Sequence, residues 1–118
     1  DLILSCCDET LEKQNILWKE KKSMCVVLCS KGYPDIYKKN VEIPNIEKIE
    51  NNESFFIYHA GTKKENNKVY ADGGRVLNFV SISDNLKLSR EKVIREIENL
   101  NWKEGFYRRD IGYKIIDK

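Results

Sequence analysis

The clearest alternation of apolar and polar positions lies between residues 86 and 99. Apolar side chains recur there at helical spacing, and most positions between them are charged, which is typical of an amphipathic helix with one buried stripe. Asp84 or Asn85, just before this segment, suits the capping position. We therefore predict a helix at 86–99 that packs one face on a sheet and leaves its charges in solvent. The residues of the predicted buried face are Leu86, Val93, Ile97 and Leu100, with Ile94 beside them.

Shorter apolar runs indicate strands. Residues 23–30 contain a continuous apolar run that suits a strand covered on both faces, although periodicity alone also allows a buried helix. Residues 55–60 predict a second strand. Residues 68–70 and 75–83 predict a hairpin, because the connection 71–74 contains the Asp-Gly and Gly-Gly pairs of tight turns with positive φ.

The remaining segments have weaker patterns. Residues 1–14 predict a short helix, and Ile16-Leu17-Trp18 a short strand. Residues 35–53 indicate an irregular connection, 63–67 a hydrophilic loop, and 105–116 a turn or edge followed by a final strand. The fold class that follows is α+β, with a mainly antiparallel, barrel-like or sandwich-like sheet, the helix near 86–99 and a short amino-terminal helix.

Composition and charge narrow the classes of function. The chain has 118 residues, enough for one domain with one modest core. Its formal charge of +2 comes from 21 basic and 19 acidic residues that are interspersed, so we expect no nucleic-acid partner. The longest apolar runs are too short to cross a bilayer, and no signal-peptide pattern is present, so we expect no membrane partner and a cytoplasmic location.

The four cysteines are expected to be reduced, buried thiols. Cys6, Cys7, Cys25 and Cys29 form no C-x-x-C pair, and His59 is distant in sequence, so we expect no metal site in this chain. Free cysteine commonly behaves as a small buried apolar residue.

Three stretches carry residues suited to binding an anion. A glycine pair allows close approach of the backbone, whose N–H groups can form an anion-binding nest, and arginine grips phosphate with two parallel hydrogen bonds. In the last stretch, Asp110 is placed to orient one of two adjacent guanidinium groups. The stretches are His59-Ala60-Gly61-Thr62, Asp72-Gly73-Gly74-Arg75 and Tyr107-Arg108-Arg109-Asp110-Ile111-Gly112.

Each stretch also has a purely structural explanation. A glycine pair between strands is usually only a turn, a lone histidine is usually structural, and arginines beside an aspartate commonly form surface ion pairs. No nucleophile with a base, no phosphate-binding Walker loop and no pair of catalytic carboxylates is found. The residues alone therefore indicate an α+β domain with an anion site formed by Arg75, Arg108 and the Gly73-Gly74 turn, and no catalytic residue.

The same stretches resemble, in order and spacing, the carboxy-terminal domain of the glycinamide ribonucleotide synthetase family. The resemblance covers nearly the whole chain. Asp35 stands where the family often has a glycine, and 38–54 does not align, so no role is carried over to the turn at 32–35. The segments that carry the resemblance are Cys25-Val26-Val27-Leu28 with Gly32-Tyr33-Pro34, Phe56-Ile57-Tyr58-His59-Ala60-Gly61-Thr62, Gly73-Gly74-Arg75-Val76-Leu77 and Phe106-Tyr107-Arg108-Arg109-Asp110-Ile111-Gly112.

The resemblance implies a part in an ATP-grasp ligase of purine biosynthesis. In that family, ATP phosphorylates the glycine carboxylate and the amine of 5-phosphoribosylamine attacks the acyl phosphate. ATP and Mg²⁺ or Mn²⁺ are bound by regions absent from this chain, so the chain alone should be inactive. Residues 1–22 would connect from the ATP-grasp core, and 23–118 would be the carboxy-terminal domain, packed on the ATP-grasp and amino-terminal domains.

The resemblance also assigns roles in closing the substrate cleft. Arg75 and Arg108 would contact the substrate phosphate, Arg109 being a weaker candidate, and Gly73 and Gly74 would allow the approach. The remaining substrate-binding candidates, which would shape or orient the cleft, are His59, Gly61, Thr62 and Asp110. Two alternatives stay open: the terminal domain of another ATP-grasp enzyme, such as a carboxylase, and a non-catalytic module that binds a phosphorylated metabolite.

Overall fold

The computed structural model describes residues 1–116, so positions 117–118 of the predicted domain lie outside the described residues. The predicted α+β class is confirmed, but the two sheets do not close into a barrel within these residues. The elements are α1 (Leu2–Cys7), η1 (Leu11–Lys13), β1 (Lys22–Ser30), β2 (Val41–Glu42), η2 (Ile46–Lys48), β3 (Phe55–His59), β4 (Thr62–Glu65), β5 (Lys68–Ala71), β6 (Arg75–Ser83), α2 (Leu86–Asn99), β7 (Gly105–Phe106) and α3 (Tyr113–Ile116).

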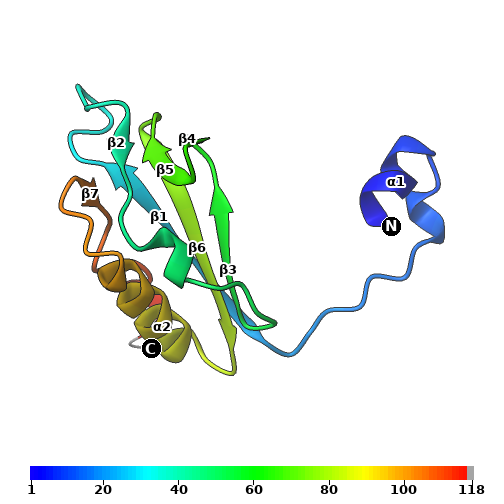
Figure 1. The fold of residues 1–118 in the computed structure, drawn as a ribbon. Coiled ribbons are helices and arrows are strands. Elements are labelled where there is room, and N and C mark those ends of the chain that lie inside the picture. The colour runs from blue at the N-terminus through cyan, green and yellow to red at the C-terminus, as the bar shows by residue number, and fades with distance from the viewer. Residues whose placement is uncertain (117–118) are drawn as a thin grey trace.

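Two antiparallel sheets form the body of the molecule (Figure 1). The larger sheet has the strand order β3-β6-β1-β7, and the smaller has the order β2-β5-β4. In the larger sheet, β1 and β6 pair along most of their length, from Lys22 opposite Ser83 to Cys29 opposite Arg75. The register shifts between Leu28 and Cys29, at the end of the sheet where β6 begins.

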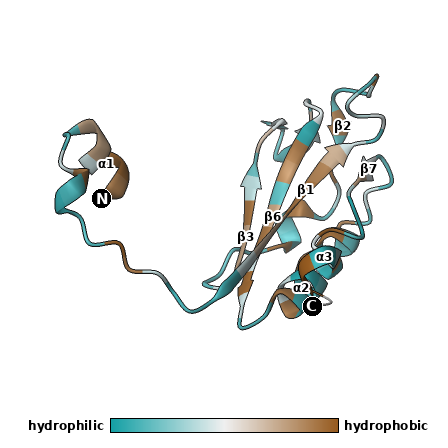
Figure 2. Ribbon diagram, turned by 180° about the vertical axis from the view of Figure 1, so that it is seen from behind, coloured by the Kyte–Doolittle hydropathy of each residue, from teal (hydrophilic) through white to brown (hydrophobic). Residues whose placement is uncertain are grey.

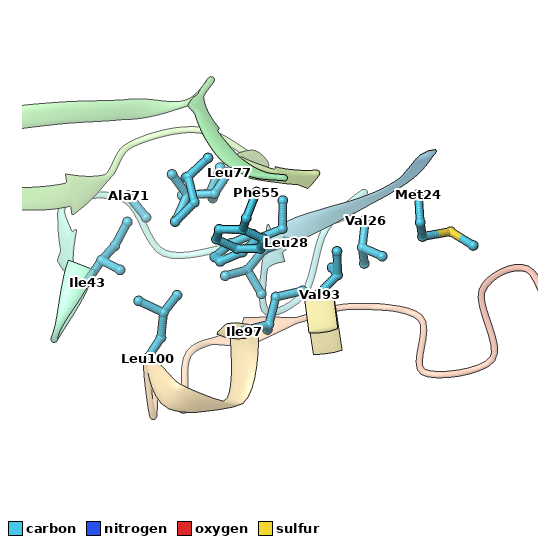
Figure 3. Close-up of a cluster of buried hydrophobic side chains, with 13 residues drawn as sticks. Met24, Val26, Leu28, Ile43, Phe55, Ala71, Leu77, Val93, Ile97 and Leu100 are labelled. Carbon is cyan, nitrogen blue, oxygen red and sulfur yellow. The ribbon is translucent and has the colours of Figure 1, made fainter. Parts of the chain in front are cut away.

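Helix α2 covers one face of the larger sheet, as its apolar stripe predicts. Of the two predicted caps, Asn85 is the one that acts, and its side chain accepts a 2.8 Å hydrogen bond from the Leu88 N–H. Val93, Ile97 and Leu100 lie buried against the sheet, beside side chains from β1, β3 and β6 (Figure 3). The core therefore lies between α2 and the larger sheet.

The opposite face of the larger sheet is left open by residues 1–116. Burial alternates along the first part of β1: Met24 and Val26 are buried, whereas Cys25 and Val27 are exposed. The prediction of a strand covered on both faces is thus wrong for residues 1–116. The continuous apolar run arises because the uncovered face is itself partly apolar.

The predicted hairpin of residues 68–70 with 75–83 is also wrong. Strand β5 pairs with β4 and β2, whereas β6 pairs with β3 and β1, so the segment 71–74 connects two sheets. Gly73 and Gly74 have no positive φ, contrary to the turn expected there. The actual hairpin joins β4 to β5 through Asn66 and Asn67, which have φ values of 48° and 62°, a region that asparagine tolerates.

Five smaller expectations need correction. Residues 1–14 form two short helical segments instead of one helix, and 16–18 form no strand. The connection 35–53 contains β2 and η2, and the predicted final strand is replaced by α3. The thiols of Cys6, Cys7 and Cys25 are exposed, and only Cys29 is buried, because the first three lie on surfaces that this chain leaves uncovered.

The amino-terminal arm, defined here as residues 1–20, extends away from the body (Figures 1 and 2). Its apolar side chains are exposed: Leu17 is 84% and Trp18 is 88% accessible. The radius of gyration is 16.7 Å, larger than the roughly 13–14 Å of a compact domain of this length. Within the described part of the chain, helices are too short or too polar to span a membrane.

Candidate functional site

Two of the predicted stretches cross where β3 and β6 meet the smaller sheet. The Gly61 N–H donates to the Arg75 carbonyl at 2.9 Å, and the Asp72 and Gly73 N–H groups donate to the Gly61 carbonyl at 2.8 and 3.0 Å. A Cβ added to Gly61 would lie 2.7 Å from both the Arg75 carbonyl oxygen and the Gly73 Cα. Glycine is required here by the close approach of two backbones.

These hydrogen bonds also use donors that the predicted anion-binding nest would need. The N–H groups of Asp72 and Gly73 would be part of such a nest, but both donate to Gly61. Cationic side chains are then the better candidates for holding an anion at this end of the sheet.

A hollow of about 470 Å³ lies beside this crossing, on the open face of the larger sheet. We call it the Arg75 hollow. It combines a guanidinium, a phenol, an amide and apolar surface, a mixture suited to a small polar ligand. Its lining residues are Val27, Tyr33, Ala60, Gly74, Arg75 and Asn78.

Arg75 differs from the other four arginines of the chain. Among residues 1–116, its guanidinium makes no ion pair or hydrogen bond. Arg95 lies 3.8 Å from a Glu96 oxygen, Arg109 donates to Glu98 at 2.7 Å, and Arg90 donates to a backbone carbonyl. An exposed cation without an acidic partner is free to bind an anion.

Arg108 and Asp110 form a forked ion pair, as the sequence predicts. The Arg108 Nε and Nη2 atoms donate to the two carboxylate oxygens at 3.1 and 2.9 Å. These hydrogen bonds lower the pKa of Asp110 and raise that of Arg108. Arg108 does not line the Arg75 hollow, so the structure does not join it to the crossing.

His59 faces a second hollow. Its Nδ1 lies 2.9 Å from the Thr62 Oγ1, and its ring lines a space of about 470 Å³ between η2 and the smaller sheet. Lys64, Lys68 and Glu42 also line that space, and the last two form an ion pair of 2.9 Å. His59 and Arg75 therefore belong to segments joined by backbone contacts but line different hollows.

No metal ligand set was found among residues 1–116, where no three His, Cys, Asp or Glu side chains are grouped to hold an ion.

Residues 23–114 match the family described as "Phosphoribosylglycinamide synthetase, C domain". The chain belongs to this family. It is 40% identical, over 95% of its length, to the phosphoribosylamine–glycine ligase of Fusobacterium nucleatum, and 38% identical over 95% to that of Caldanaerobacter subterraneus. It spans about a quarter of the length of these relatives, 26% in both cases.

A solved structure supports the same fold for this phosphoribosylglycinamide synthetase C domain. The phosphoribosylamine–glycine ligase of Thermotoga maritima superposes with a TM-score of 0.68 at 25% sequence identity. The match covers 92% of this chain and 27% of that one. The architecture is therefore that of the family's terminal domain.

Sequence reasoning missed two polar residues of the Arg75 hollow in this C domain. Tyr33 stands in the Gly-Tyr-Pro segment, from which no role was carried over. Asn78 is the one amide within the otherwise mostly apolar strand β6, and that interruption is a signal visible in the sequence. Asn78 lies on β6, the strand that begins with Arg75, whereas Tyr33 follows β1 and comes close to Arg75 through the pairing of β1 with β6.

Proposed function

We propose that this chain is the carboxy-terminal domain of a phosphoribosylamine–glycine ligase and that Arg75 binds the 5-phosphate of phosphoribosylamine. The names of the relatives support the ligase, and the chain covers only about a quarter of each of them. The observation that carries the role of Arg75 is its guanidinium, unpaired among residues 1–116, beside a hollow on an open sheet face.

The chemistry of the substrate fits this hollow. A sugar phosphate needs a cation for its phosphate and uncharged donors and acceptors for its hydroxyl groups. Arg75 supplies the first, and the Asn78 amide supplies the second. Holding the amine of phosphoribosylamine near the reacting acyl phosphate would provide the advantage of proximity without a catalytic residue in this domain.

The open face of the larger sheet would form one wall of the substrate cleft. It carries exposed apolar side chains such as Val27 and Tyr58, and the amino-terminal arm exposes Leu17 and Trp18. Apolar surfaces of this kind are normally covered by a partner. We propose that the ATP-grasp and amino-terminal domains of the parent polypeptide cover them, and that residues 1–22 form the connection to the core.

ATP and Mg²⁺ or Mn²⁺ would bind to those other domains, where the glycine carboxylate would be phosphorylated. The reaction and a cytoplasmic location belong to the parent enzyme in this proposal. His59, Gly61 and Thr62 would shape the rim of the cleft, with Gly73 and Gly74 allowing close approach. Arg108 and Asp110 stay substrate-binding predictions, with less support than Arg75 because they neutralise each other.

The test is Arg75→Ala in the full-length ligase. We expect the KM for phosphoribosylamine to rise roughly 10- to 150-fold, the effect of losing a hydrogen-bonded charge contact, while the KM for ATP changes less than about threefold. Arg95→Ala, on the exposed side of α2, is the matched control and should leave both constants unchanged. Small and equal changes in both constants for Arg75→Ala would remove this residue from the site.

A further inference from the structure

The backbone immediately before Arg75 is held by one residue of β1. The Ser30 N–H donates to the Gly74 carbonyl at 2.8 Å, and the Ser30 hydroxyl donates to the Gly73 carbonyl at 2.8 Å. Ser30 is only 3% exposed. Two consecutive peptide groups are thus fixed by a single buried side chain and its own backbone.

The ring of Tyr33 limits the same segment from a second direction. A Cβ added to Gly74 would lie 2.2 Å from the Tyr33 Cδ2, so the ring lies directly on the glycine. Because Gly74 has no positive φ, its backbone conformation is open to alanine, and the ring is what excludes a side chain. The Tyr33 N–H donates to the Ser30 carbonyl at 3.0 Å, which joins the two residues into one unit.

Gly61 holds the other side of this segment. Its carbonyl accepts from Gly73, and its N–H donates to Arg75. The peptide groups of residues 73–75 are therefore fixed between Gly61 on one side and the Ser30–Tyr33 unit on the other. A binding group supported in this way loses less conformational freedom when it binds its ligand.

We propose that Ser30 and Tyr33 are positioning residues that fix the Gly73–Gly74 backbone and thereby hold Arg75 ready to bind the substrate phosphate. This proposal rests on the proposed function of Arg75. Ser30 does not touch the substrate; it acts through the backbone. Tyr33 acts through the ring that it places on Gly74, and its hydroxyl group is not needed for that contact.

The serine test uses the full-length ligase and compares two buried serines. Ser30→Ala removes the hydrogen bond to Gly73, and we expect the KM for phosphoribosylamine to rise about 3- to 10-fold, the effect of one lost hydrogen bond, with kcat and the KM for ATP nearly unchanged. Ser81 is fully buried, and its hydroxyl has no hydrogen-bond partner among the described residues. Ser81→Ala therefore removes a buried hydroxyl without this contact and should leave the KM unchanged.

The tyrosine test separates the ring from the hydroxyl group. Tyr33→Phe keeps the ring on Gly74 and should bind phosphoribosylamine nearly as the wild type does, whereas Tyr33→Ala should raise that KM. Gly74→Ala should raise it too, because the new methyl group meets the ring, and the double variant Gly74→Ala/Tyr33→Ala should recover part of the loss. Equal constants for Tyr33→Phe and Tyr33→Ala would overturn the role of the ring.

A double-mutant cycle distinguishes this proposal from the proposed function. If Ser30 acts through Arg75, Ser30→Ala should have no further effect on the KM for phosphoribosylamine in the Arg75→Ala background. An equal effect in both backgrounds would show a general structural role and overturn the positioning role. If Arg75→Ala itself leaves that KM unchanged, the proposed function of Arg75 is wrong. If Arg75→Ala raises the KM strongly but Ser30→Ala and Tyr33→Ala do not, only the positioning role of Ser30 and Tyr33 is wrong.

Discussion

Gly61 has room for a hydrogen atom and for nothing larger. Its α-carbon lies against the Gly73 backbone and the Arg75 carbonyl, where an added Cβ would come within 2.7 Å of both. Both neighbours are main-chain atoms of residues whose backbones are hydrogen-bonded to Gly61, so neither moves away easily. The crossing of the two stretches thus depends on this residue being glycine.

Gly61→Ala should therefore destabilise the domain. We expect the free energy of unfolding to fall by about 1–3 kcal/mol, the usual effect of overpacking a tight contact. Urea denaturation of the 118-residue chain, followed by circular dichroism, measures this change. The control is Ala60→Ser, which adds one atom at the neighbouring exposed position. An equally large fall in the free energy of unfolding for this variant would show that the segment tolerates no change at all, and the steric argument would fail.

The pKa of Asp110 reports on its pair with Arg108. Hydrogen bonding from Arg108 lowers this pKa, so the pair stabilises the fold above the unfolded pKa of the carboxyl and loses that effect as pH falls through the lowered value. Both side chains are well exposed, so solvent screens the interaction. Arg108→Gln should raise the pKa of Asp110 in an NMR titration of the carboxyl carbon; an unchanged pKa would show that the ion pair is absent in solution.

Sequence reasoning singled out Arg75 as a candidate but gave a different reason for the glycines beside it. The Gly73-Gly74 pair predicts a turn with positive φ, whereas the structure needs glycine there because Gly61 and the Tyr33 ring approach so closely. Such contacts arise between segments that are distant in the chain and leave no local pattern. For the same reason, the sequence did not rank Arg75 above Arg108, whose partner Asp110 is only two residues away.

At the scale of single elements, local signals were the dependable ones. Helix α2 was predicted with the correct bounds, because its stripe, its charges and its cap all lie within one continuous segment. Strands β1, β3 and β6 were placed close to their observed positions. The pairing partner of β6 was predicted wrongly, because the β5–β6 connection resembles a hairpin turn. Strand pairing depends on where distant strands lie, which local sequence does not show.

The cap of α2 gives a prediction at this scale. Asn85→Ala removes the acceptor for the Leu88 N–H, and we expect the free energy of unfolding to fall by about 0.5–2 kcal/mol. Asp84→Ala is the matched control, because Asp84 was the other candidate cap but forms only an exposed ion pair with Lys21. Thermal or urea denaturation compares the two. A larger loss for Asp84→Ala would mean that the helix begins one residue earlier than the structure shows.

At the scale of the whole molecule, residues 1–116 leave two apolar surfaces uncovered that the sequence pattern did not reveal. One is the open face of the larger sheet, and the other is the amino-terminal arm. Periodicity predicts that an apolar residue is buried but does not identify what covers it. The apolar run of β1 predicted cover on both faces, and the apolar residues 16–18 predicted a strand. In the parent ligase proposed above, the surfaces that cover these residues would lie in other domains, so this chain alone does not show them covered.

Because the arm contacts so little of the body, it should be the first part of the isolated chain to be cut by a protease. Trypsin should cleave after Lys13 and Lys19 well before it cleaves after Lys87 and Lys92, which lie in α2 and serve as internal controls. Mass spectrometry of the early fragments identifies the sites.

Removal of residues 1–20 should then change the free energy of unfolding of the remaining body by less than about 0.5 kcal/mol, because the core between α2 and the larger sheet includes no residue of the arm. In the full-length ligase, the same arm should resist trypsin, since its apolar side chains would be covered there. Rapid cleavage of the arm in the full-length enzyme would contradict that packing. A marked loss of stability in the truncated chain would show instead that the arm folds back onto the open sheet face in solution.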